Sequence, residues 1–280
     1  MSILKTKTVK GGENTEIEMD IFYLNQIPDA MEKMGWEMAP KLMRHWFNTK
    51  PAYAFTESEK TKLIKQIDAI DIPKERVNDT IVKMDWALKY KQVERCIESL
   101  KNSWATPNGI NLLKKRLKNS KDRKIGYYDS ILEIDSFSTV NYESVGGLLD
   151  TIDDWYAAIG KATIKIAVRG RADKLNNKDV FVNEAIGFYI KDSYDFVGNE
   201  EFLGVWSKNG ILSKAKSALF KGYYDAMQWK ELAGEYSGYV PIQNLDFRAW
   251  QRKHNEGGDF IVFSDILWMP PINKHKVIIL

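Results

Sequence analysis

Ala185-Ile186-Gly187-Phe188-Tyr189-Ile190-Lys191-Asp192-Ser193-Tyr194-Asp195-Phe196 is the stretch of sequence that decides the fold. It belongs to a run from Val180 to Asp195 that is rich in β-branched and aromatic residues, which predicts one long strand. Residues 163–168 and 260–268 have a similar composition. Because helices and strands do not alternate in this half, we expect a curved antiparallel sheet or an open β-barrel decorated with helices, and not a parallel sheet.

The first half of the chain is predicted to be helical, which makes the expected fold class α+β. Apolar residues recur there at helical spacing. Residues 82–88 alternate like a strand but also fit a helix, and both possibilities stay open. The helices that we expect span residues 27–46 with a break at Pro40, 57–67, 90–104, 108–117, and 148–159 before Gly160.

Three regions follow from these patterns. Residues 1–20 are polar and hold Gly11-Gly12, which indicates a mobile lead-in or a short edge hairpin. Residues 21–125 are expected to form a helical subdomain, and residues 126–280 a β-rich candidate catalytic domain. The boundary follows a basic run from Lys114 to Lys124. A solvated helix face explains this run, and the alternative is a dock for anionic lipid head groups or a phosphorylated ligand.

Composition excludes several classes of protein. A net charge of +3 over 280 residues is too small for a nucleic-acid partner, which requires a concentrated basic face. Cys96 is the single cysteine, so the chain cannot build an internal disulfide or a thiolate zinc site. The first residues lack the apolar segment of a signal peptide, and no stretch has the length of a transmembrane helix. We therefore expect synthesis in the cytoplasm, with another export route if the protein acts elsewhere.

The most unusual polar cluster lies at the end of the long predicted strand. Asp192 and Tyr194 share one face of an extended chain, and a bend at Gly198-Asn199 is expected to bring Asp195 to the same side. Two carboxylates and a phenol suit metal-assisted phosphoester cleavage, because a carboxylate can hold a cation or orient water and a phenol can donate to an oxyanion. The alternative is a strand end whose aspartates accept backbone hydrogen bonds in the turn.

A second polar cluster surrounds Arg248, which lies between Phe247 and Trp250 and is expected to be partly buried. A buried guanidinium requires a carboxylate or a phosphate as its partner. One interpretation is a structural ion pair with Asp246 or Asp259. The other is a clamp on a phosphate oxygen in the transition state.

The segment Asp192-Ser193-Tyr194-Asp195-Phe196 resembles the Asp-x-Tyr-Asp-Phe core of the colicin M family, and residues 187–190 and 257–263 are similar to its flanking segments. The resemblance spans roughly residues 151–280. It implies an open β-barrel-like fold and an enzyme that hydrolyses lipid II, the undecaprenyl-linked peptidoglycan precursor, between the lipid and the pyrophosphate. It also implies a divalent cation, with Mg²⁺ the expected ion, and Asp195 as the essential carboxylate beside Asp192 and Tyr194.

The chain departs from the colicin M pattern just after this motif. That family places a His-Arg pair there, whereas this chain continues Val197-Gly198-Asn199-Glu200-Glu201-Phe202. An inserted segment from Leu203 to about Gln243 would separate the motif from Arg248 and His254, which are the candidates for the missing pair. We expect Arg252 and Lys191 to bind the substrate.

Residues 27–47 are similar to an uncharacterised bacterial family that is often encoded beside type VI secretion genes. The leading hypothesis is therefore an antibacterial toxin that a type VI system delivers to the periplasm of a neighbouring cell, where it hydrolyses lipid II. Its further expected partners are a cognate immunity protein and a component of the secretion apparatus. One alternative is a hydrolase of another phosphorylated lipid or sugar. The other is a non-enzymatic adaptor or chaperone that docks effectors through a stripe comprising Met31, Met34, Met38 and Trp46.

Overall fold

The computed structural model describes residues 2–7, 16–147, 150–198 and 201–280 of the chain. The chain divides into two units. Residues on both sides of position 125 contribute strands to the sheet of the second unit, so the division differs from the boundary expected there. Unit 1 comprises Met1–Thr56, Thr151–Ala158 and Asp195–Asp259, and unit 2 comprises Glu57–Asp150, Ile159–Tyr194 and Phe260–Leu280.

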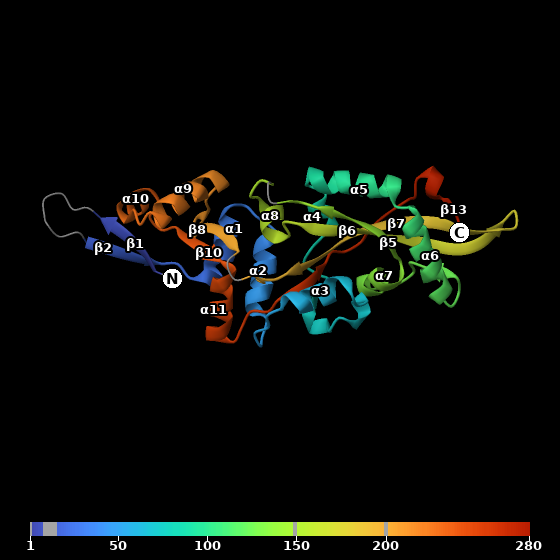
Figure 1. Cartoon of the computed structure of the whole chain (residues 1–280), viewed down its shortest axis with the longest axis horizontal. Helices are drawn as coiled ribbons and strands as arrows, with labels where there is room; N and C mark the ends of the chain where they lie inside the picture. Colours follow the sequence, from blue (N-terminus) through green and yellow to red (C-terminus); the bar gives the residue numbers. More distant parts are fainter. Residues whose placement is uncertain (1, 8–15, 148–149, 199–200) are drawn as a thin grey trace. The chain divides into compact units, whose positions relative to one another are not determined.

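A long antiparallel hairpin forms the centre of unit 2 (Figure 1). Its strands are β6 (Ala162–Leu175) and β7 (Lys178–Tyr194), so the long strand expected from the sequence is confirmed. Asn176 and Asn177 connect the two strands, with φ of 49° and 62°. A two-residue turn with positive φ at both positions matches the natural twist of paired strands, and asparagine tolerates that conformation.

The remaining strands of unit 2 extend this hairpin into a curled mixed sheet. Along β7 lie three antiparallel strands, and β3 (Val77–Asn78) is parallel to the first of them. The α+β class and the curved, largely antiparallel sheet are therefore confirmed. The strands along β7 are β11 (Phe260–Phe263), β12 (Leu267–Met269) and β13 (Val277–Ile279), and those along β6 are β4 (Lys124–Ile125) and β5 (Thr139–Val145).

Helices lie over both faces of this sheet, with α5 on one side and α3 and α7 on the other (Figure 1). The helices expected from residue 57 to residue 117 are confirmed, and the undecided segment 82–88 contains a short helix, α4. The bounds are α3 Glu57–Lys65, α4 Met84–Ala87, α5 Lys91–Ser103, α6 Pro107–Asn119 and α7 Ile131–Phe137, with short 3-10 turns η2 Ala69–Asp71, η3 Lys74–Arg76 and η4 Asn273–His275.

The first two strands of unit 1, β1 and β2, form a hairpin, which was one of the two structures expected for residues 1–20. The Gly11-Gly12 pair lies outside the described residues. Residues 27–48 form two helices, as expected, and Pro40 lies in the first turn of the second. Of the helix expected over residues 148–159, residues 148 and 149 lie outside the described residues, and the structure has a helix only over Asp154–Ala158. The elements are β1 Ser2–Lys7, β2 Glu16–Ile21, η1 Leu24–Gln26, α1 Ile27–Lys33, α2 Ala39–Asn48, α8 Asp154–Ala158, β8 Phe202–Ser207, β9 Gly210–Ile211, α9 Lys214–Asp225, α10 Trp229–Glu235, β10 Val240–Gln243 and α11 Asn244–His254.

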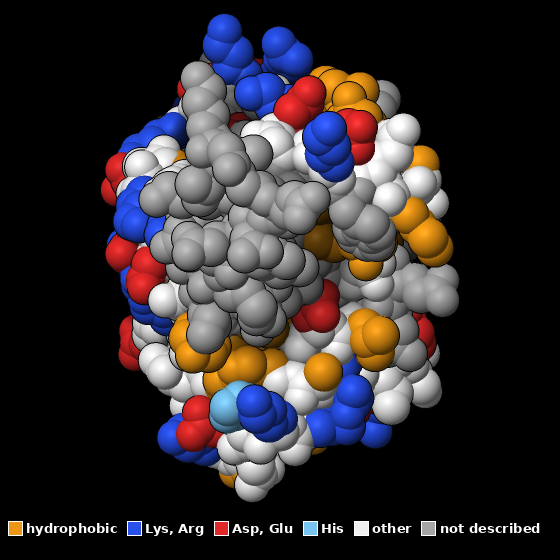
Figure 2. Space-filling view, turned by 90° about the vertical axis from the view of Figure 1, so that its left-hand side faces the viewer, with side chains coloured by type: hydrophobic (Ala, Val, Ile, Leu, Met, Phe, Trp, Pro, Cys, Tyr) orange, Lys and Arg blue, Asp and Glu red, His pale blue; other side chains and the backbone are white. Residues whose placement is uncertain are grey.

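Aromatic side chains fill the interior of unit 1. Trp46 is fully buried and packs edge-to-face against Phe196 and Phe247, whose rings stack at 3.7 Å between centroids. Met31 and Met38 are also buried, so most of the stripe that could serve a partner belongs to the core. Figure 2 shows exposed apolar side chains between charged ones on the face it presents, which is ordinary for a protein surface.

None of the helices in the described ranges combines the length and the apolar composition needed to cross a membrane.

Asp154 of α8 stabilises the start of α2 within unit 1. Its buried carboxylate accepts hydrogen bonds from the backbone amides of Glu37, Met38 and Ala39 at 2.8–3.1 Å. The first amides of a helix have no partner within the helix, so an acceptor at this place stabilises both the helix end and the packing of α8.

We predict that Asp154→Ala lowers the free energy of unfolding by about 2–3 kcal/mol, because it leaves buried amides without an acceptor. Urea unfolding measures the change. Asp153→Ala is the matched control, since the Asp153 side chain accepts from the amide of Tyr156 within the same helix turn. Equal effects of the two substitutions would contradict this role for Asp154.

Candidate functional site

One face of the central hairpin of unit 2 carries polar side chains where an apolar surface is usual. Ile164 and Ile190 are fully buried on one face. Lys165 and Tyr189 are direct cross-strand partners, and Lys191 follows two residues after Tyr189, so all three side chains share the opposite face. Polar groups at such positions are costly unless they find hydrogen-bonding or charged partners.

Asp135 of α7 supplies that partner. Its carboxylate is 5% exposed and forms ion pairs with Lys165 and with Lys191, the latter at 3.3 Å between Oδ2 and Nζ. The Tyr189 hydroxyl donates a hydrogen bond to the same carboxylate and lies 2.5 Å from Oγ1 of Thr139. The sheet, β5 and α7 thereby meet in one buried polar cluster, which we call the Asp135 cluster (Asp135, Thr139, Lys165, Tyr189 and Lys191).

The Asp135 cluster contains two ammonium groups and one carboxylate. Burial by itself raises the pKa of Asp135, but the charges of Lys165 and Lys191 and the hydrogen bonds from Lys165 and Tyr189 together hold that pKa below its usual value. Burial lowers the pKa of Lys165, against the attraction of Asp135, and the charge of Lys191 lowers it further. A buried excess of positive charge is unfavourable in isolation, so a bound anion would stabilise this arrangement.

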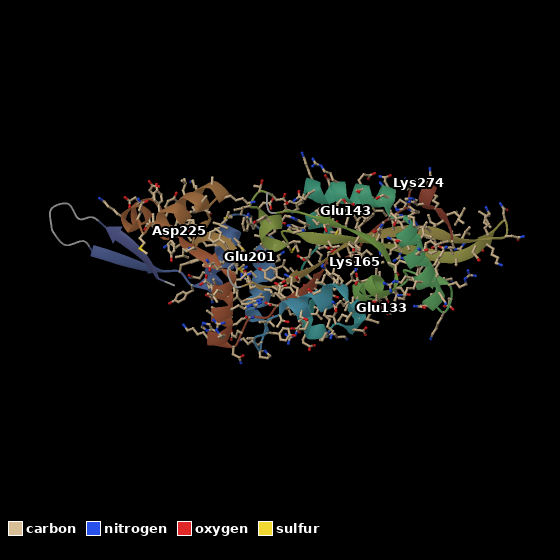
Figure 3. The ribbon with its side chains drawn as sticks, in the orientation of Figure 1. Glu133, Glu143, Lys165, Glu201, Asp225 and Lys274 are labelled. Carbon is tan, nitrogen blue, oxygen red and sulfur yellow. The ribbon has the colours of Figure 1, made fainter. Side chains whose placement is uncertain are left out.

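A cavity of about 560 Å³ opens onto the Asp135 cluster. Figure 3 labels Lys165 on the sheet of unit 2. Arg116 of α6 also lines the cavity, and its buried Nε has no hydrogen-bond partner among the described residues. Its nearest carboxylate is Asp68, at 4.0 Å from Nη1. The charged lining residues are Lys65, Arg116, Lys165 and Lys191 against Asp68 and Asp135, so positive charge exceeds negative charge.

These positions indicate a site for an anion. Arg and Lys side chains that line a cavity bind phosphate or carboxylate groups through charge-assisted hydrogen bonds. The volume is typical of a small-molecule pocket. Because Lys165 and Lys191 already form ion pairs with Asp135, their positions are fixed before a ligand binds. The site therefore requires little rearrangement to receive an anion.

The sequence matches a family of unknown function (DUF6402) over residues 22–279. The chain belongs to this family. No curated protein and no solved structure matches the chain.

Lys191, which was expected to bind substrate beside the Asp192–Asp195 motif, is the predicted site residue that lines this cavity. Asp192 and Tyr194 follow it in β7. Tyr194 is buried, its ring stacks on Phe260 at 5.3 Å, and burial strongly raises the pKa of its hydroxyl.

Asp195 belongs to unit 1, whereas Asp192 and Tyr194 belong to unit 2. Oδ1 of Asp195 accepts a hydrogen bond from the amide of Val197 at 3.1 Å. This is the backbone contact that the alternative interpretation of the strand end expected. Gly198 has a φ of 92°, consistent with a turn, and Asn199 lies outside the described residues.

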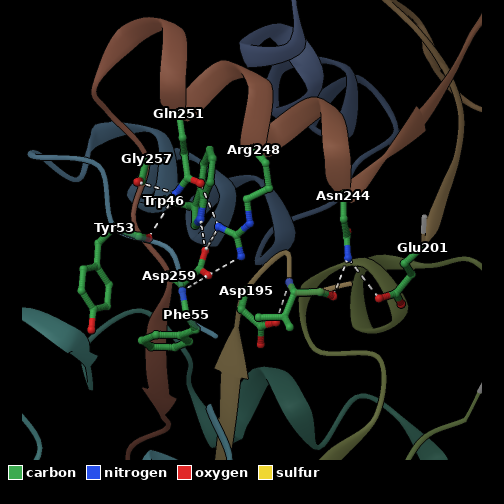
Figure 4. A network of polar contacts seen from close by, with 11 residues as sticks. Trp46, Tyr53, Phe55, Asp195, Glu201, Asn244, Arg248, Gln251, Gly257 and Asp259 are labelled. Carbon is green, nitrogen blue, oxygen red and sulfur yellow. Dashed lines mark hydrogen bonds and ion pairs between the residues drawn. The ribbon is translucent and has the colours of Figure 1, made fainter. Parts of the chain in front are cut away.

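Arg248 forms the ion pair with Asp259 that was one of its two interpretations (Figure 4). Its Nη1 and Nη2 donate to the two carboxylate oxygens at 3.0 and 2.6 Å, and Nη1 also donates to Gln251 at 2.8 Å. The carboxylate accepts two further hydrogen bonds, from Nε1 of Trp46 and from the amide of Phe55, both at 2.8 Å. The guanidinium is thus engaged by protein groups, and its role as a phosphate clamp stays a prediction.

Arg252 and His254 are exposed residues of α11, whereas Arg248 of the same helix is buried. The His254 ring stacks on Trp250 at 4.6 Å between centroids, and both residues line a second cavity of about 590 Å³ in unit 1. Arg248 is absent from the lining of that cavity. The structure therefore does not bring Arg248 and His254 together as a pair.

The expected magnesium ion requires side chains that could act as its ligands. In the ranges that the structure describes, no three His, Cys, Asp or Glu side chains gather as metal ligands. Mg²⁺ is often held by one or two carboxylates together with substrate phosphates, so the expected magnesium ion stays a prediction.

Sequence reasoning did not single out Asp135, Lys165, Tyr189 or Thr139. A signal was present, because Lys165 interrupts the apolar strand pattern of residues 163–168, and Asp135 interrupts the apolar helix Ile131–Phe137. Opposite charges at two such interior positions would have been reason to expect a buried pair.

We predict that Asp135→Ala lowers the free energy of unfolding by about 3–5 kcal/mol, because it leaves two buried ammonium groups without their counter-ion. Urea unfolding of the purified variant measures the effect. Glu133→Ala on the same helix is the control and should change stability by about 0.5 kcal/mol or less. A small effect of Asp135→Ala would show that the lysines are not held as cations.

Proposed function

We propose that the protein binds a phosphate-bearing substrate, a phosphorylated lipid or sugar, in the cavity of unit 2 and hydrolyses its phosphoester. The observation that supports this proposal is the surplus of positive charge that lines the cavity, at Lys165, Lys191 and the half-buried Arg116. A phosphate group compensates that charge and satisfies the unpartnered Nε of Arg116.

Four residues of the cavity and the Asp135 cluster have roles in the proposed reaction. Lys191 and Arg116 bind non-bridging phosphate oxygens, whose negative charge is spread over the transferring group in the transition state. Asp135 holds Lys191 in place, and Tyr189 fixes the orientation of that carboxylate. Cations that are already positioned before the substrate arrives stabilise the transition state without a cost of reorganisation.

We predict that Lys191→Met lowers the hydrolysis of a cleaved substrate by about 10²–10³-fold, as expected for loss of a preorganised electrostatic group. Released phosphate or pyrophosphate is measured on lipid II, other undecaprenyl phosphates and sugar phosphates, with and without Mg²⁺. Methionine keeps an unbranched side chain that is only one heavy atom shorter and removes the charge. Lys178→Met, an exposed position in the same strand, is the control.

The proposed site is wrong if Lys191→Met folds normally and retains full activity. Inorganic pyrophosphate provides a separate binding measurement, because a ligand that binds the folded state raises the unfolding temperature. It should stabilise the wild type and the Lys178→Met variant more than the Lys191→Met variant.

A second candidate function is hydrolysis of lipid II at the lipid–pyrophosphate bond by a centre that contains Asp195. The resemblance of Asp192-Ser193-Tyr194-Asp195-Phe196 to the colicin M motif supports it, together with the position of this motif at the end of the longest strand. In this proposal the protein is an antibacterial toxin exported by a type VI system to the periplasm of a target cell. An immunity protein would protect the producer.

Asp195→Ala distinguishes the second candidate from the first. If Asp195 is the essential carboxylate, its loss should lower release of the pyrophosphorylated disaccharide-peptide from lipid II by about 10²-fold or more. Asp225→Ala, which changes an exposed carboxylate of the same unit, is the matched control. Full activity of the Asp195→Ala protein would exclude this centre and leave the cavity of unit 2 as the candidate.

A further inference from the structure

Lys165 is the more accessible of the two amines in the Asp135 cluster. Its side chain is 16% exposed and lines the cavity, whereas that of Lys191 is 4% exposed. The Lys165 Nζ lies 5.9 Å from the centroid of the Tyr189 ring. A small molecule in the cavity therefore meets more of the Lys165 side chain than of Lys191, which lines the same cavity as a charged neighbour.

The surroundings of Lys165 favour the neutral amine more than a surface position does. The charged and titratable groups that face it come from three elements: Asp135 from α7, Lys191 and Tyr189 from β7, and Arg116 from α6. Burial and the positive charges of Lys191 and Arg116 lower the pKa of Lys165, while Asp135 opposes them. A desolvated lysine beside a second cation is a recognised form of an activated amine nucleophile.

The cavity also holds a place for an anionic group. The buried Nε of Arg116 has no partner among the residues described, and Lys65 lines the same cavity. A ligand that carries both a phosphate and a reactive carbonyl would satisfy the guanidinium with one end and reach Lys165 with the other.

We propose that Lys165 is a nucleophilic amine that forms an imine with a phosphorylated aldehyde or ketone bound in this cavity. The nitrogen of Lys165 forms a bond to the carbonyl carbon, and the carbonyl oxygen leaves as water. Both hydrogens of that water come from the neutral amine, and the Asp135 carboxylate transfers one of them. The step needs no oxidant or reductant. It uses the same cavity as the proposed hydrolase but does not depend on hydrolysis.

Pyridoxal phosphate is the probe, because it is an aldehyde with a phosphate group. The full-length protein is incubated at neutral pH with pyridoxal phosphate at low molar excess, reduced with borohydride to trap the imine, and digested for peptide mass spectrometry. We expect Lys165 to be labelled about tenfold faster than the average exposed lysine, because the rate follows the fraction of neutral amine. Inorganic pyrophosphate should suppress this labelling.

Three controls make the result specific. Lys165→Met should lose the fast label while circular dichroism shows an intact fold. Lys191→Met should retain a label on Lys165 but at a lower rate, because the second cation is gone. Pyridoxal without its phosphate should label Lys165 more slowly than pyridoxal phosphate does.

Two outcomes would overturn the inference. Labelling of Lys165 no faster than that of exposed lysines shows that the amine is not activated. Fast labelling that pyrophosphate does not suppress and that pyridoxal matches excludes a phosphorylated ligand. Neither result depends on substrate turnover, so failure of the proposed hydrolysis and failure of this inference can be told apart.

Discussion

The buried carboxylate of Asp135 is the constraint on which the arrangement of unit 2 depends. Taking such a charge out of water is costly, and it requires donors at fixed positions. The hairpin provides them because Lys165 lies directly opposite Tyr189 and Lys191 lies two residues further along β7. A slip of one residue in either strand would turn its donors to the other face, so the register of the sheet and the polar cluster determine each other.

Unit 1 contains a second buried ion pair with a different balance of charge. One guanidinium, Arg248, meets one carboxylate, Asp259, and Trp46 and Phe55 donate the remaining hydrogen bonds. Every partner that this pair requires comes from the protein, as expected of a structural network that fixes α11 and the neighbouring loops. The Asp135 cluster has an excess of cations and an adjoining cavity, and this difference is why we place the proposed function there.

Membership of this family shows which part of the chain its relatives share, but it names no activity or ligand. The matched region, residues 22–279, includes helices and strands of both units, so the family model spans both units and not one of them alone. The two candidate sites are adjacent along the chain at the end of β7. Lys191 lines the cavity of unit 2, and the motif from Asp192 to Phe196 follows directly after it.

The sequence alone determined the helices of the first half, the division of the first helical stretch just before Pro40 and the long strand that ends near Asp195, because these depend on local periodicity and on proline geometry. It also named Lys191 as a substrate-binding residue. One of its two interpretations of Arg248 was a structural ion pair with Asp246 or Asp259, and the structure shows the pair with Asp259. Only the tertiary structure decided the division into units and the meeting of Asp135 with Lys165 and Lys191. Such contacts join residues that are distant along the chain, and they depend on strand register and helix placement, which local patterns do not encode.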